Sequence, residues 1–220
     1  MSEKSNILNR MRDIALSLSV ASNYGQRLSR IQLQKFIYLI DVVSPLFYIL
    51  PPQLAHQTYK HGPYDVSIQN AVDVLAFRGL VKINGVQKHT NGTISAEYTL
   101  NSFGQSWVDR LVSEQIFVPK WEAAQAVGLK INKLGWYRLV DLVYAEPTFI
   151  ATRPKGYGQE LHSNDGLSSS AAFLMAMMDR ALRYGHDKDE VDGALIVELF
   201  FRYLDQYDRV QRTMQFSVEE

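Results

Sequence analysis

The 220-residue chain contains no cysteine at all. Disulfides, thiolate nucleophiles and cysteine-ligated zinc or iron–sulfur sites are therefore excluded, and the absence fits a reducing compartment such as the cytoplasm. The N-terminal residues show no signal-peptide pattern, and no run reaches the ~18–20 apolar residues that cross a bilayer. Histidine is scarce, with five residues, and none of them shows the spacing of a metal-binding pair on one helix. We therefore expect a cytoplasmic protein without membrane segment, metal or cofactor.

The chain also lacks net charge, because 23 basic residues balance 23 acidic ones. The distribution is uneven: residues 1–60 carry seven Lys and Arg against three Asp and Glu, whereas residues 179–220 carry six against ten. Phosphate contacts supply much of the affinity of DNA-binding proteins, which usually present a basic face. The basic first third allows such a face, and the overall neutrality does not favour it.

What is present is ordinary globular composition, with 46% hydrophobic and 21% charged residues. Apolar spacing predicts an amphipathic helix over residues 5–22 and a second helix that begins at Ser29, where Gln32 has the spacing of a capping box. A third helix is predicted after Gly62-Pro63-Tyr64, with Asp65 as N-cap and Gly79 at its end. Two strands, 80–86 and 93–100, flank an Asn-Gly hairpin signal at Asn91-Gly92, and a fourth helix starts near Ser102 with a second capping box completed by Gln105.

This order of helices and hairpin predicts a winged helix-turn-helix over residues 1–116. Residues 117–220 are predicted to be a helical region packed on it, with long apolar helices over 168–184 and 189–207 and a loose tail over 209–220. The expected fold class is α+β, mostly helical: a winged helix-turn-helix with a helical C-terminal extension.

Three motifs carry a resemblance. Leu33-Gln34-Lys35-Phe36-Ile37-Tyr38, then Gly62-Pro63-Tyr64, then Tyr98-Thr99-Leu100 with Gly104, resemble poorly characterised prokaryotic winged-helix proteins of the YwgA type. The first two motifs are also similar to the SocA-like (Panacea) antitoxin domain. The resemblance covers residues 28–110, with His61 in place of the usual aromatic residue and Asp65 in place of the usual serine. It implies no catalytic residue, and the antitoxin likeness implies a protein partner.

The third helix stands at the position of a recognition helix, and Asn and Gln side chains can read adenine edges. The candidate residues for binding DNA or a partner are the polar and basic side chains of this helix, the turn before it and the wing: Lys60, His61, Ser67, Gln69, Asn70, Arg78, Lys82, Lys88 and His89. The turn at Gly62-Pro63-Tyr64 is interpreted mainly as architecture that sets the direction of the helix.

Two further motifs are weaker. The segment 153–158 combines basic residues and glycines that suit a phosphate, but it lacks the Lys-Ser/Thr ending of a P-loop, so a flexible surface loop is favoured. Arg180 and His186 have the spacing of ribonucleases of the HEPN type. Ala181 and Gly185 depart from that pattern, and favourable contact of basic residues with a helix C-terminus is the simpler interpretation.

The leading hypothesis is a non-enzymatic regulatory protein that binds DNA, for example in transcription regulation. The alternative is an antitoxin-like or accessory protein of a bacterial phage-defence or toxin–antitoxin operon that binds a protein encoded nearby. A HEPN-like ribonuclease is a distant third. Apolar residues in excess of one packed stripe predict that residues 168–207 also hold a homodimer or another stable complex: Leu174, Met175, Met177, Met178, Leu195, Leu199, Phe200 and Phe201.

Overall fold

A computed structural model describes residues 3–47, 56–90, 92, 94–161, 168–184 and 192–216. The chain is α+β and mostly helical, with one small three-stranded antiparallel sheet among the described residues. The N-terminal elements follow in the order α1 (Glu3–Asn23), β1 (Leu28–Ser29), α2 (Arg30–Val43), α3 (Val66–Phe77), β2 (Val81–Lys88), β3 (Ile94–Leu100) and α4 (Ser102–Ser113). Short 3-10 turns extend α2 (Ser44–Phe47) and join α4 to the next helix (Gln115–Phe117).

The C-terminal region consists of α5 (Val118–Leu134), α6 (Leu139–Tyr144), α7 (Pro147–Thr152), α8 (Ser169–Tyr184) and α9 (Gly193–Phe216). Short 3-10 turns precede α6 (Trp136–Arg138) and follow α7 (Arg153–Lys155). One continuous hydrophobic core joins both regions, from Ile14 of α1 through Phe36 of α2 to Phe201 of α9. The tail predicted over 209–220 was wrong as far as residue 216, because α9 continues to Phe216.

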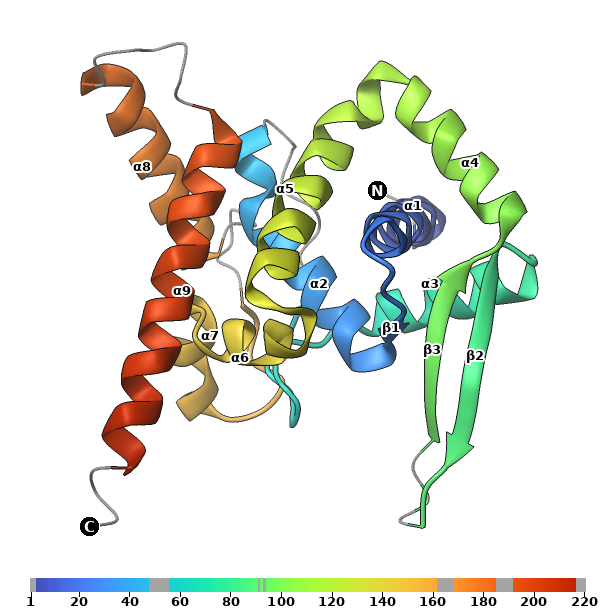
Figure 1. The fold of residues 1–220 in the computed structure, drawn as a ribbon, viewed down its shortest axis with the longest axis horizontal. Coiled ribbons are helices and arrows are strands. Elements are labelled where there is room, and N and C mark those ends of the chain that lie inside the picture. The colour runs from blue at the N-terminus through green and yellow to red at the C-terminus, as the bar shows by residue number, and fades with distance from the viewer. Residues whose placement is uncertain are drawn as a thin grey trace.

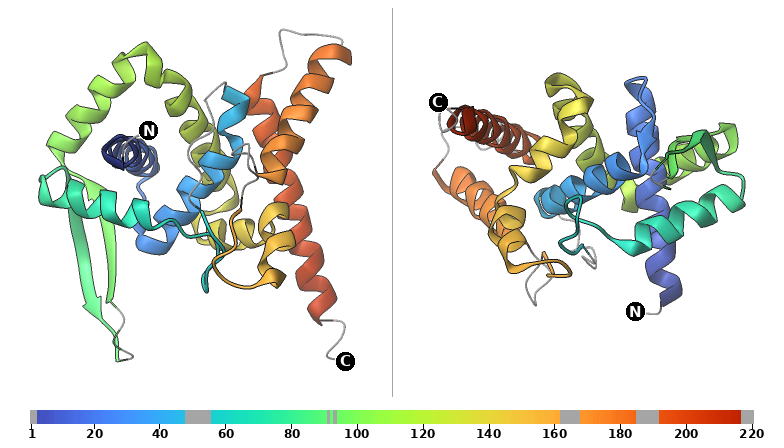
Figure 2. Two further views of the ribbon diagram at one scale, coloured as in Figure 1. Left: turned by 180° about the vertical axis from the view of Figure 1, so that it is seen from behind. Right: turned by 90° about the horizontal axis from the view of Figure 1, so that it is seen from below.

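Helix α1 is the centre of the N-terminal half rather than an amphipathic helix with one solvated face. Viewed end-on, it is surrounded by α2, α3, β3, α4 and α5, and α4 and α5 form an arch over it (Figures 1 and 2). Apart from the half-buried Arg12, every residue from Arg10 to Ala21 is buried. Arg10 and Asp13 therefore lie inside the protein, where charge must be paired.

The sheet has the order β1-β3-β2, and both pairings are antiparallel. The very short β1 places Leu28 opposite Tyr98, and β2 and β3 form a hairpin that projects from the body of the molecule (Figure 1). A register shift after Asn84 bends the hairpin. Gly92 has a φ of 80°, as the hairpin signal predicted, while Asn91 lies outside the described residues.

Two of the three predicted N-terminal caps are confirmed, and α4 begins at Ser102 as predicted. Ser29 and Gln32 form a complete capping box, and the Asp65 carboxylate accepts from the Ser67 amide to cap α3. The capping box at Ser102 was wrong: Asn101 is the N-cap of α4 and accepts from the Gly104 amide at 2.9 Å. Gln105 instead donates to Asp109 and accepts from the Ser19 hydroxyl.

Candidate functional site

The predicted binding residues lie on α3, on the turn before it and on the hairpin, and most of their side chains are exposed. The basic and imidazole side chains of the set are all exposed: Lys60, His61, Arg78, Lys82, Lys88 and His89. Asn70 is also exposed, whereas Ser67 and Gln69 are half-buried. Ser67 donates to the capping carboxylate of Asp65, and Gln69 donates to Asp73, so both side chains are engaged within the helix.

The solvent-facing stripe of α3 has a composition that the sequence prediction did not single out. Val66, Asn70, Asp73 and Phe77 follow one another at helical spacing, opposite the buried stripe that packs on α1. Val66 is 60% exposed and Phe77 is 94% exposed. The helix contains no Lys, Arg or His, and Asp73 is its only charged residue. We call these four residues the α3 stripe.

The polar residues of the Gln34-Lys35-Tyr38 motif are buried and build the fold. The Gln34 amide pairs with both the backbone N–H and the carbonyl of Asp65, at 2.9 and 2.8 Å. Lys35 donates to the Pro63 carbonyl at 2.7 Å, and burial lowers the pKa of Lys35 to about 7. The motif therefore fixes the Gly62-Pro63-Tyr64 turn and the start of α3 from beneath.

Tyr38 extends this arrangement to the C-terminal region. Its hydroxyl donates to Glu146 at 2.6 Å, and burial together with the Glu146 carboxylate raises the pKa of Tyr38 well above its usual value. The same carboxylate caps α7 by accepting from the Thr148 and Phe149 amides. A motif that resembles a family signature is thus explained by contacts within the chain, without a ligand.

A buried ionic network lies below the start of α3. The Arg10 guanidinium contacts the carboxylates of Asp41 and Asp65 at 2.9 and 2.8 Å and that of Asp13 at 3.2 Å. His56 lies 3.0 Å from Asp41. Burial alone would raise the pKa of Asp41, but Arg10 and His56 lower it to about 2. The network is buried, and its ion pairs connect α1, α2, the start of α3 and the loop at residue 56.

Lys120 of α5 pairs with Asp13 and adds the C-terminal region to this network. Sequence reasoning missed the network because its members are far apart in the chain. The only sequence signal was the occurrence of Arg10 and Asp13 among apolar residues that turned out to be buried on every side.

The segment 153–158 is exposed, as expected of a surface loop, and hydrogen bonds join it to the turn before α3. Thr58 forms four hydrogen bonds with residues 156–159, through its amide, its carbonyl and its hydroxyl. The loop is therefore fixed beside the turn that precedes α3. Of the HEPN-type pair, Arg180 is exposed on α8 and His186 lies outside the described residues.

Among the described residues, no group of three or more His, Asp or Glu side chains is arranged to hold a metal ion. In the same part of the chain, no helix has both the length and the hydrophobicity required to cross a membrane. No protein-family model matches the sequence, and no curated protein matches it.

Proposed function

We propose that residues 1–116 form a winged helix-turn-helix that acts without catalysis in the cytoplasm, by binding a protein partner through the α3 stripe. The order α1-β1-α2-α3-β2-β3 and the sheet order β1-β3-β2 support the winged-helix assignment. In that layout α3 is the helix that a DNA-binding member inserts into the major groove.

The α3 stripe is the observation that carries the proposal. A helix that enters a groove of DNA approaches negatively charged phosphates. Asp73 at the middle of the stripe would be repelled by them, and α3 has no basic residue to attract them. Phe77 and Val66 instead place exposed apolar side chains at the two ends of the stripe. Exposed aromatic residues are typical centres of protein interfaces. We expect the partner to be a protein whose apolar residues contact Val66 and Phe77 and whose basic residue pairs with Asp73.

The test is co-expression with the products of the flanking genes, followed by titration calorimetry on any pair that co-purifies. Phe77→Ser is expected to weaken the complex by about 2 kcal/mol, which is about 30-fold in Kd. Ile116→Ser is the matched control, because Ile116 is 78% exposed and lies outside the α3 stripe. Equal binding by wild type, Phe77→Ser and the control would refute the α3 stripe as the interface.

DNA binding is the second candidate, and the hairpin favours it. Arg78, Lys82 and Lys88 are exposed near or on β2, and none of them forms an ion pair with a described residue. If DNA is the ligand, Arg78→Glu and Lys88→Glu weaken binding at every sequence and flatten its salt dependence. Asn70→Ala instead relaxes base preference. A mobility shift with DNA from the protein's own operon, absent in Arg78→Glu, would replace the protein-partner proposal with this one.

A further inference from the structure

Three tyrosines, two from the turn before α3 and one from the distant segment 153–158, form a continuous aromatic surface beside the start of α3. The ring centroids of Tyr59 and Tyr64 lie 5.2 Å apart, and those of Tyr59 and Tyr157 lie 6.3 Å apart. Tyr157 is 71% exposed and Tyr59 is 54% exposed. Tyr64 is half-buried between them and the start of α3, so Tyr59 and Tyr157 provide most of the exposed ring surface on which a base could stack. We call these three residues the tyrosine platform.

The platform is held rigidly by backbone contacts. Gln57 and Tyr64 exchange two backbone hydrogen bonds of 3.0 Å, which close the turn that carries Tyr59. The Thr58 amide donates to the Gln159 carbonyl, and the Thr58 carbonyl accepts from the Gly158 amide. These two bonds bring Tyr157 next to Tyr59. A surface fixed before binding loses little conformational entropy when a ligand binds.

Positive charge surrounds the platform. The Arg30 guanidinium donates to the Tyr64 hydroxyl at 2.7 Å and lies 5.6 Å from the centre of its ring. Lys60 and Lys155 are exposed next to Tyr59 and close to Tyr157 in the chain, and neither pairs with a carboxylate of the described residues. Within residues 56–65 and 153–160, Glu160 is the one exposed acidic side chain.

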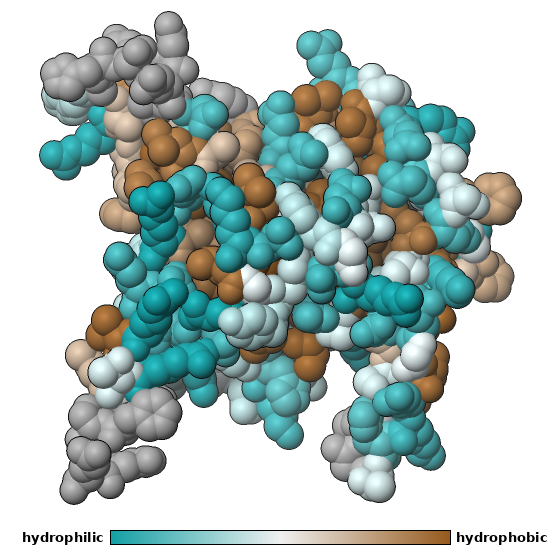
Figure 3. Space-filling model, viewed as in Figure 1, coloured by the Kyte–Doolittle hydropathy of each residue, from teal (hydrophilic) through white to brown (hydrophobic). Residues whose placement is uncertain are grey.

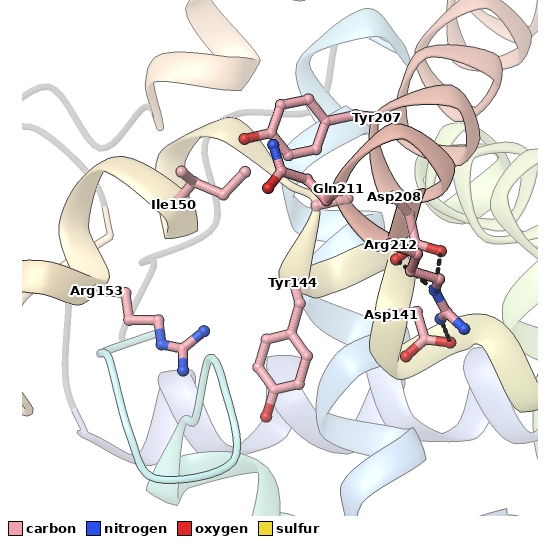
Figure 4. A pocket seen from close by; sticks show the side chains of 9 residues that line it. Asp141, Tyr144, Ile150, Arg153, Tyr207, Asp208, Gln211 and Arg212 are labelled. Atoms are coloured by element: carbon pink, nitrogen blue, oxygen red, sulfur yellow. Dashed lines mark hydrogen bonds and ion pairs between the residues drawn. The ribbon is translucent and has the colours of Figure 1, made fainter. Parts of the chain in front are cut away.

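Arg153 joins the platform to a neighbouring pocket. Its guanidinium lies 5.6 Å from the centre of the Tyr144 ring, and that ring packs against Gly62 of the turn. The pocket has a volume of about 630 Å³ and is lined by Tyr144, Arg153, Tyr207 and Gln211 among others. In Figure 4, Arg153 and Tyr144 point toward the loop before α3, and Gln211 and Tyr207 line the far side of the same space.

The two arginines that line the pocket, Arg212 and Arg153, differ in whether a carboxylate neutralises their charge. Arg212 is neutralised by Asp141 at 2.5 Å and by Asp208 at 3.0 Å. Arg153, in contrast, has no ion pair with any described residue. An anion that approaches the pocket therefore meets Arg153 as the uncompensated charge, next to an aromatic face.

We propose that this surface binds single-stranded nucleic acid. Bases stack on Tyr59, Tyr64 and Tyr157, while Arg30, Lys60 and Lys155 contact the phosphates along the strand. Arg153 holds a phosphate at the mouth of the pocket, which has room for one base, and the Gln211 amide offers a donor and an acceptor to its edge. Aromatic stacking with basic residues along the strand is how proteins bind single strands without strong sequence preference. A duplex keeps its bases stacked inside and cannot use the platform.

The test is fluorescence anisotropy with a labelled single strand of about 12 nucleotides, within the usual site sizes, and with the matching duplex as competitor. We expect binding of the single strand that weakens steeply as salt rises, and poor competition by the duplex. Tyr157→Ala is expected to raise Kd for the single strand roughly fivefold to 150-fold, as loss of a base–aromatic stack does. The double variant Arg153→Glu/Lys155→Glu is expected to weaken binding and to flatten its salt dependence.

Two exposed residues elsewhere provide matched controls. Tyr137 is 81% exposed and belongs neither to the tyrosine platform nor to the lining of the pocket, so Tyr137→Ala is expected to leave Kd unchanged. Lys133→Glu on α5 reverses one exposed charge, as each substitution of the double variant does, and it is also expected to leave Kd unchanged. Absence of single-strand binding, equal binding of duplex, or equal loss in Tyr157→Ala and Tyr137→Ala would overturn the proposal. The proposal does not depend on the α3 stripe, since Phe77→Ser is expected to bind the single strand as wild type does.

Discussion

The Nη2 atom of Arg10 lies 2.8 Å from Oδ2 of Asp65, and the other oxygen of the same carboxylate accepts from the Ser67 amide to cap α3. The buried Asp65 carboxylate therefore forms an ion pair with Arg10 of α1 and also caps the N-terminus of α3. The position of the α3 stripe relative to the core depends on this pair.

Arg10→Met is expected to destabilise the protein by about 3–5 kcal/mol, because it leaves the carboxylates of Asp41 and Asp65 buried without their cation. Urea denaturation followed by circular dichroism measures the loss. Arg202→Met is the control: Arg202 is 71% exposed and pairs with Glu198 on the surface, so its loss should cost less than about 1 kcal/mol. Equal, small effects of both substitutions would show that the network contributes little.

Gly62→Ala is expected to destabilise the turn before α3 more than a glycine substitution in open space does. Gly62 has a φ of 90°, and a Cβ there would lie 2.9 Å from Lys35 Nζ and 3.2 Å from Tyr144 Cε1. The conformational cost of about 1–2 kcal/mol is therefore joined by a steric one. Gly25→Ala has the same conformational cost without a neighbour within 4 Å. Thermal denaturation of both variants separates the two effects, and identical melting temperatures would contradict the expectation.

The titration of Lys35 is expected to increase the free energy of unfolding as pH rises from 7 toward 10. Burial lowers the pKa of Lys35 in the folded protein to about 7, while the unfolded lysine keeps a pKa near 10.5. Between these values the unfolded chain binds the additional proton, so raising the pH favours the folded state, by at most about 1.4 kcal/mol for each pH unit.

The measurement is the free energy of unfolding of wild type minus that of Lys35→Met, between pH 6 and pH 9. The difference should rise with pH above about 7, because only the wild type has the group that titrates. Lys133→Met, at an exposed position, should give a difference that does not change over the same interval. A flat curve for Lys35→Met would mean that the amine stays charged inside the protein.

Helices α8 and α9 leave an apolar groove, which bears on the predicted self-association. Its volume is about 430 Å³, and Phe173, Leu199 and Tyr203 in its lining are 62%, 42% and 46% exposed. Figure 3 shows brown apolar side chains among teal polar ones over the upper part of α9. We expect a symmetric dimer through this groove, because a surface without charge meets its own copy without repulsion.

Sedimentation equilibrium at micromolar concentration tests the dimer. Wild type should sediment as a dimer and Leu199→Glu as a monomer, whereas Leu129→Glu, at a residue that is 39% exposed on α5, should behave as wild type does. A monomeric wild type would refute the prediction, and so would a dimer that persists in Leu199→Glu.

Local sequence was sufficient for the elements of the N-terminal half. The capping box at Ser29, the Asp65 cap and the Gly92 turn are set by residues within a few positions of one another, so their backbone hydrogen bonds can be predicted from spacing alone. Where two caps competed for the same amide, at Asn101 and Ser102, spacing did not decide between them.

The tertiary structure decided what those elements do. Arg10 and Asp65 are 55 positions apart, and Tyr59 and Tyr157 are nearly 100 apart, so only packing brings each pair together. The same holds for α1, whose apolar residues indicated one buried face but which is enclosed on all sides by elements from the rest of the chain. Periodicity in a sequence reports how apolar a helix face is, whereas the number of neighbours around that helix depends on how the whole chain folds.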